Sequence, residues 1–184
     1  MEYNFEIFGP QYQAVLFFVQ HLAYCRGLKP ALDNITDHKE FWVSTTDGHL
    51  KLATIAWCKV FGSRKEDIHW AKTPTGNIPK DAKDDFRLKL FSNTGFTQVQ
   101  WEKYHTNMLA FRDKYVAHLD LNNRFNEPVP FFDPALQVAY AYEDWARELT
   151  KEVIWNQPTL ISIYEQCEGE MSSIVPKRPR RGRG

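Results

Sequence analysis

Four segments of the chain carry apolar residues at spacings of three and four, the repeat that places side chains on one face of an α-helix. These segments are residues 11–27, 37–61, 97–119 and 134–153. No stretch of the sequence shows the alternation of apolar and polar residues between tight turns that is typical of a hairpin strand. Four amphipathic helices therefore predict an all-α fold, a four-helix bundle.

Individual residues predict where some of these helices begin and end. Thr97 is suited to the N-cap of the third helix, and Pro134 to the first turn of the fourth. The second helix has a polar stretch at Thr45–Gly48 that predicts a possible interruption. Residues 81–91 and 159–167 each predict one additional short helix, so the bundle has one or two helices beyond the main four.

The chain of 184 residues is long enough for one domain with its own core, and its 43% of hydrophobic residues exclude a generally disordered protein. We expect a single helical domain over residues 1–175 and a flexible tail over residues 176–184. The tail holds five of the 23 basic residues and none of the 23 acidic ones, so residues 1–175 carry a net charge of about −5. The basic residues of the tail are Lys177, Arg178, Arg180, Arg181 and Arg183.

A basic tail on an acidic body can bind nucleic acid through phosphate charge. It can also be a solvated chain end, and the tail has no aromatic residue to stack on bases. We favour the solvated end and keep RNA binding by the tail as the weaker alternative.

Several features predict a cytoplasmic protein that does not enter membranes. The longest apolar run, Ala14–Val19, is far shorter than the roughly 20 residues that cross a bilayer, and Met1–Asn4 lacks the basic opening of a secretory signal. The three cysteines, Cys25, Cys58 and Cys167, have neither disulfide-framework nor zinc-site spacing, and we expect them to be structural. No cofactor motif and no metal-ligand cluster is present, so neither cofactor nor metal is predicted.

The strongest candidate site is the stretch 112–118, RDKYVAH, near the end of the third helix. Histidine exchanges protons near neutral pH, which suits His118 to the proton transfers of RNA cleavage by a 2′-hydroxyl. The permanent charge of Arg112 suits it to the phosphoryl oxygens, where negative charge develops. Asp113 can orient either of these side chains. Tyr115 is a secondary candidate that could turn toward the same site.

Helical geometry limits what Arg112 and His118 can do within one chain. Six residues turn an α-helix by about 600°, so the two side chains would point about 120° apart and lie about 9 Å apart along the axis. One helix cannot easily close both on a single phosphate. A two-fold symmetric dimer can place two copies of the motif across one cleft, and we therefore expect a homodimer with the third helix at or beside the interface.

The motif Arg112-Asp113-x4-His118 resembles the hallmark of HEPN-domain proteins, in which an Arg is followed by a polar residue, four further residues and a His near the end of a bundle helix. The sequence His118-Leu119-Asp120 also resembles the abortive-infection branch of that family. The resemblance covers about residues 12–153. Asp113 stands where Asn is commoner, which weakens the resemblance at that position.

The resemblance implies a HEPN-like bundle and a metal-independent endoribonuclease of the toxin or phage-defence kind. Its catalytic residues would be Arg112, His118 and Asp113, its substrate RNA, and its active site a dimer interface. An antitoxin or a nucleotidyltransferase would be a possible partner.

Two alternatives stay open. A non-catalytic HEPN module would dimerise and bind RNA, nucleotide or a partner protein. A purely structural bundle would be favoured if Arg112 and His118 were buried in salt bridges. We interpret Asp84 and Asp85 as part of a solvated face. The other histidines are each expected to be structural or at the surface: His21, His38, His49, His69 and His105.

Overall fold

The computed structural model describes residues 5–35, 37–73, 81–117, 128–150 and 157–174. Within these residues the protein is all helical and contains no strand, which confirms the predicted all-α class. The α-helices are α1 (Phe5–Leu28), α2 (Lys39–Phe61), α3 (Ala82–Thr94), α4 (Gln98–Phe111), α5 (Asp133–Leu149) and α6 (Leu160–Ile174). Two short 3₁₀ helices, η1 (Lys29–Asn34) and η2 (Trp70–Lys72), and a π-helical segment, η3 (Arg112–Ala117), complete the elements.

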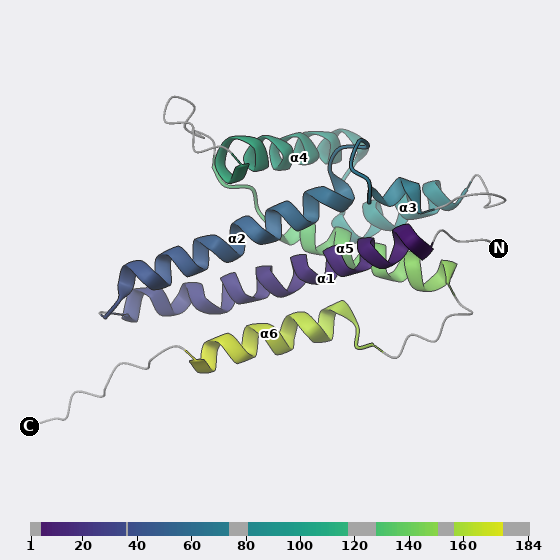
Figure 1. Ribbon diagram of the computed structural model, residues 1–184. Coiled ribbons are helices and arrows are strands. Elements are labelled where there is room, and N and C mark those ends of the chain that lie inside the picture. Colours follow the sequence, from purple (N-terminus) through teal and green to yellow (C-terminus); the bar gives the residue numbers. More distant parts are fainter. Residues whose placement is uncertain (1–4, 36, 74–80, 118–127, 151–156, 175–184) are drawn as a thin grey trace, which may run out of the picture.

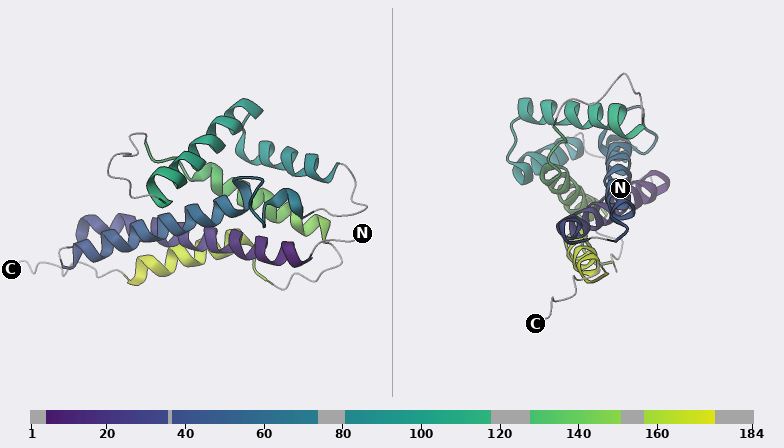
Figure 2. Two further views of the ribbon diagram at one scale, coloured as in Figure 1. Left: turned by 45° about the horizontal axis from the view of Figure 1, so that its top comes forward. Right: turned by 90° about the vertical axis from the view of Figure 1, so that its left-hand side faces the viewer.

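The two long helices α1 and α2 run antiparallel and pack along each other (Figure 1). Helix α6 packs on α1, and α3 packs on α5. Figure 2 shows α4 and α6 on opposite sides of the bundle, with α1, α2 and α5 between them. None of the described helices is long and apolar enough to span a bilayer.

Large aromatic side chains fill the core, and those with a polar atom use it to join two helices. The buried Trp57 of α2 donates its indole N–H to the carbonyl of Ala135 in α5, 3.3 Å away. The buried Trp145 of α5 donates in the same way to Ala82 in α3, at 2.7 Å. Because a buried indole N–H without a partner would be costly, these bonds help to fix how the helices meet.

The start signals at Thr97 and Pro134 are confirmed. Thr97 caps α4 with a full capping box, in which its hydroxyl accepts the Gln100 N–H and Gln100 Oε1 accepts the Thr97 N–H. Pro134 lies in the first turn of α5. Gly95 ends α3 in the left-handed region at φ 68°, a conformation that glycine adopts without strain.

Other boundaries differ from the prediction. Helix α1 begins at Phe5 and runs through Pro10, α6 extends to Ile174, and α2 is continuous across Thr45–Gly48. The two threonines of this stretch, Thr45 and Thr46, donate their hydroxyls to the carbonyls four residues earlier, so their polar groups are satisfied inside the helix. The last part of the expected third helix is not α-helical, because residues Arg112–Ala117 form the π-helix η3.

Candidate functional site

The candidate site begins where α4 ends and η3 follows. A π-helix is rare, and single π turns in α-helices are frequent at functional positions. Segment η3 continues from α4 and packs against α2. The separation of about 120° expected between Arg112 and His118 assumed an α-helix, and it does not apply to this π-helical segment. His118 itself lies outside the described residues, as do the five basic residues of the tail.

Two carboxylates hold the guanidinium of Arg112. Its Nε donates to Oδ1 of Asp113 at 2.7 Å, and its Nη1 lies 3.5 Å from Oε1 of Glu66. The hydrogen bond to Asp113 is the largest cause that raises the pKa of Arg112 above its usual value. The arginine is therefore charged and oriented, and its side chain is 22% exposed. It is paired but not fully buried.

Asp113 is the group that orients Arg112 in this structure. Its side chain is 56% exposed and reaches back along the chain to the neighbouring guanidinium. The structure thus brings Arg112 and Asp113 together, as the motif suggested. It adds Glu66, a residue of the segment that follows α2 and lies 46 positions earlier in the sequence than Arg112. No local pattern in the sequence marks Glu66 for this contact.

Tyr115 faces α2 and not Arg112. Its hydroxyl donates to Oδ1 of Asp47 at 2.7 Å, a bond that raises the pKa of Tyr115 to about 12. Its ring stacks on Phe111 with centroids 5.0 Å apart, and the ammonium of Lys51 lies 5.1 Å from the ring centroid. These contacts attach η3 to α2. Tyr115 therefore supports the position of η3, and its hydroxyl is engaged away from the arginine.

The remaining histidines have distinct surroundings. His105 lies in α4, and its Nε2 donates to the carbonyls of Phe61 and Gly62 at 2.9 and 3.2 Å, which pins α4 to the end of α2. His38 is exposed. His21 of α1 and His49 of α2 place their Nδ1 atoms 2.7 Å apart, and burial lowers the pKa of both, that of His21 to about 4.

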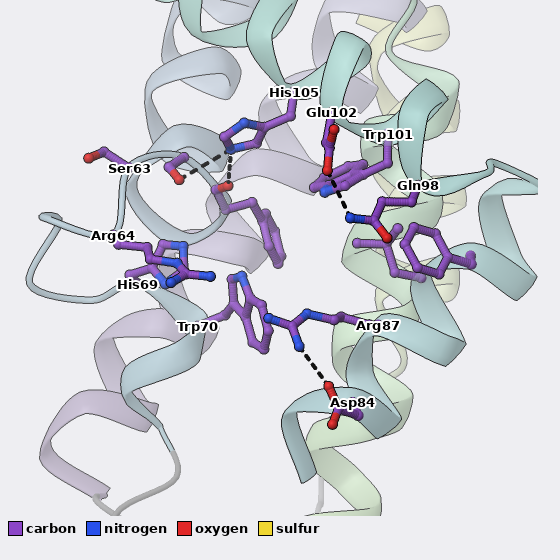
Figure 3. A pocket seen from close by; sticks show the side chains of 14 residues that line it. Ser63, Arg64, His69, Trp70, Asp84, Arg87, Gln98, Trp101, Glu102 and His105 are labelled. Carbon is purple, nitrogen blue, oxygen red and sulfur yellow. Dashed lines mark hydrogen bonds and ion pairs between the residues drawn. The ribbon is translucent and has the colours of Figure 1, made fainter. Parts of the chain in front are cut away.

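A cavity of about 710 Å³ lies on another part of the surface, between α3, α4 and the segment that joins α2 to η2 (Figure 3). Arg112 does not line it. Asp84, at its edge, pairs with Arg87 at 2.6 Å, and both Asp84 and Asp85 are exposed, as expected for a solvated face. Within the described part of the chain, no group of three or more His, Cys, Asp or Glu side chains is arranged to hold a metal ion.

A comparison of the chain with models of protein families finds no match, and comparisons with curated proteins and with solved structures find none either.

Proposed function

We propose that this chain is a HEPN-type, metal-independent endoribonuclease of the toxin or phage-defence kind, working in the cytoplasm as a homodimer. The observation that carries the proposal is the Arg112 guanidinium, oriented by Asp113 at 2.7 Å and still partly exposed, six residues before His118. An oriented cation at the surface is what a phosphate-binding site in a shared cleft needs.

In the proposed reaction the 2′-hydroxyl of RNA attacks the adjacent phosphorus, and the bond to the 5′ oxygen breaks. His118 takes or supplies a proton in this exchange, because an imidazole titrates near neutral pH. Arg112 stabilises the negative charge that grows on the non-bridging oxygens. Asp113 acts as a positioning residue, since its bond to Nε fixes the plane of the guanidinium and leaves Nη2 without a partner among the described residues.

A two-fold dimer would complete the site. We infer that η3 and the end of α4 lie at or beside the interface, so that the motif of one protomer faces that of its partner. Light scattering at micromolar concentration should then give the mass of a dimer, and a strictly monomeric species would count against the inference. An antitoxin or a nucleotidyltransferase remains a possible partner of such a dimer.

One observation favours the second candidate, a non-catalytic HEPN module that binds RNA, nucleotide or a partner protein. Asp113 and Glu66 together carry two negative charges beside the single positive charge of Arg112. Carboxylates at these positions weaken the attraction of Arg112 for phosphate. This arrangement suits an arginine that holds η3 in place as well as one that binds RNA.

The ends of the reaction products separate the two candidates. Cleavage by the 2′-hydroxyl leaves a 2′,3′-cyclic phosphate on one product and a 5′-hydroxyl on the other. We expect incubation with RNA in EDTA to give these ends, and DNA of the same sequence to stay intact. Binding of RNA without any cleavage would support the non-catalytic module.

A further inference from the structure

The cavity between α3, α4 and the segment after α2 is a second candidate site, with chemistry unlike that of Arg112. Its volume of about 710 Å³ lies within the range of about 300–1,000 Å³ that is usual for small-molecule sites. It opens between two walls (Figure 3). Its lining includes polar and aromatic side chains that can contact a ligand: Arg64, His69, Trp70, Gln98, Trp101 and Glu102.

One wall presents a buried imidazole with a free N–H. His69 is only 4% exposed, and its Nδ1 accepts the backbone N–H of Ala71 at 3.2 Å. Because Nδ1 acts as the acceptor, the proton of the neutral ring is on Nε2. The structure gives Nε2 no hydrogen-bond partner among the described residues, although His69 lines the cavity. No buried side-chain nitrogen or oxygen of the described residues lacks a partner, so solvent reaches this Nε2 and its N–H is open to a ligand that enters the cavity.

A network of buried polar groups fixes the backbone that carries His69. The amide Nε2 of Gln11, in α1, donates to the carbonyl of His69 at 2.8 Å. The Oε1 of Gln11 in turn accepts the hydroxyls of Tyr142, at 2.8 Å, and of Thr73. Gln11 is fully buried and every one of these groups is satisfied. The imidazole is therefore held in place before any ligand arrives, which lowers the cost of binding.

The same wall is positively charged. Arg64 is exposed, and no carboxylate among the described residues pairs with it. Burial lowers the pKa of His69 to about 4, and the positive charge of Arg64 lowers it further. His69 is therefore a neutral N–H donor at pH 7, on the same wall as the positive charge of Arg64. A guanidinium beside an N–H donor is a pairing that recognises phosphate or carboxylate oxygens.

The opposite wall, formed by α4, carries one indole and two polar side chains. The indole of Trp101 and the amide of Gln98 come from α4 and belong to this wall, whereas the indole of Trp70, from η2, lies beside His69 with ring centroids 5.6 Å apart (Figure 3). Gln98 donates to Oε1 of Glu102 at 2.9 Å, which leaves the second amide hydrogen and the amide oxygen for a ligand. Indole faces stack on heteroaromatic rings, and amide groups match the donors and acceptors along the edge of a base.

We propose that this cavity binds a nucleoside monophosphate, with its phosphate on Arg64 and His69 and its base against the indoles, beside Gln98. A nucleoside monophosphate has both features that the two walls require, an anionic group and a planar ring with polar edges. The site is separate from Arg112, so the inference stands whether or not the chain cleaves RNA.

Isothermal titration calorimetry of the full chain tests the inference. The probes are the four ribonucleoside 5′-monophosphates, the four uncharged nucleosides and inorganic phosphate. At least one monophosphate should bind, about tenfold more tightly than its own nucleoside and than phosphate, because only the monophosphate contacts both walls. Absence of binding by all four monophosphates at millimolar concentration would overturn the inference. Inorganic phosphate that binds as tightly as the monophosphates would also overturn the inference, since the base would then contribute nothing to the affinity.

Two neighbouring substitutions locate the ligand. Arg64→Gln should weaken binding of the monophosphate about tenfold, whereas Lys65→Gln removes the same charge from the next residue, which does not line the cavity, and should leave the affinity unchanged. Both side chains are exposed, so both variants should fold with native circular dichroism. Arg112→Gln should also retain the affinity. Binding that survives Arg64→Gln but is lost in Arg112→Gln would place the ligand at Arg112 and contradict the inference.

Discussion

Arg112 and Asp113 are neighbours in the sequence, and they form a hydrogen bond of 2.7 Å between Nε and Oδ1 at the start of a π-helical segment. Adjacent residues on an α-helix point in different directions, so a side-chain pair between them is not the usual contact. The bond fixes the orientation of the Arg112 guanidinium.

If the chain is a nuclease, Asp113→Ala should lower kcat about 10- to 100-fold through loss of this orientation, with a smaller change in KM. Asp113→Asn keeps an acceptor oxygen and should recover much of the loss. Steady-state kinetics on a short RNA would measure both variants. A kcat that is the same in the wild type and in Asp113→Ala would show that Asp113 does not position Arg112 for catalysis.

The pair His21 and His49 should make stability depend on pH. Burial lowers the pKa of His21 to about 4 and lowers that of His49 as well, while an unfolded chain takes up these protons at a pKa of about 6.5. The unfolded state therefore binds more protons between about pH 6.5 and 4, and the free energy of unfolding should fall as the pH decreases through this range. Allowing for partial exposure, we expect the pair to account for about 1–2 kcal/mol.

Urea unfolding at several pH values would measure this effect. The double variant His21→Gln/His49→Gln can keep a hydrogen bond between α1 and α2 but cannot titrate, so its stability should change less with pH. The exposed His38 provides the control, and His38→Asn should retain the wild-type pH dependence. An unchanged pH dependence in the double variant would mean that other groups are responsible.

Two glycines should respond in opposite ways to replacement by alanine. A Cβ at the buried Gly27 would lie 2.7 Å from Cβ of Met171 and 2.8 Å from the carbonyl oxygen of Glu168, so Gly27→Ala should push α6 away from α1 and cost about 1–3 kcal/mol. A Cβ at Gly48, inside α2, meets nothing within 4 Å. Gly48→Ala should stabilise the protein by about 0.5–1 kcal/mol. Thermal unfolding would compare them, and equal effects would mean that α6 does not pack on Gly27 as described.

Local signals in the sequence were sufficient for much of the fold. The periodic apolar spacing located the main helices, and the caps at Thr97 and Pro134 located two helix starts, because these effects depend on residues close together in the chain. Contacts over long sequence distances could not be predicted in this way. Asp47 reaches Tyr115 because η3 packs on α2, and Glu66 reaches Arg112 because the segment after α2 also comes close to η3.

The second site was missed for the same reason. His69 was expected to be structural or exposed, and it is indeed buried and bonded to Ala71. Its free N–H becomes apparent only when the wall formed by α4 faces it. The π-helical form of residues Arg112–Ala117 was also not predictable, since the apolar spacing of this segment fits an α-helix equally well.

Exchange of subunits between two inactive variants would test whether the proposed active site is shared. Arg112→Ala and His118→Ala homodimers should each be inactive. In an equal mixture, about half of the dimers contain one copy of each variant. If each active site combines the Arg of one protomer with the His of the other, every such mixed dimer has one intact site and one site that lacks both residues. The mixture should therefore recover about a quarter of the wild-type activity. Formation of the mixed dimer without recovery would place Arg112 and His118 of one site in the same chain.

Cleavage of RNA in the presence of EDTA, by the wild type and by His118→Ala, tests whether this chain is a metal-independent nuclease. We expect the wild type to cleave RNA without a metal ion. The rate should fall about 10²- to 10⁴-fold in His118→Ala, the usual contribution of a positioned acid or base, while the helical circular dichroism stays native. No cleavage by the wild type, or cleavage at an equal rate by a folded His118→Ala variant, would contradict the proposal.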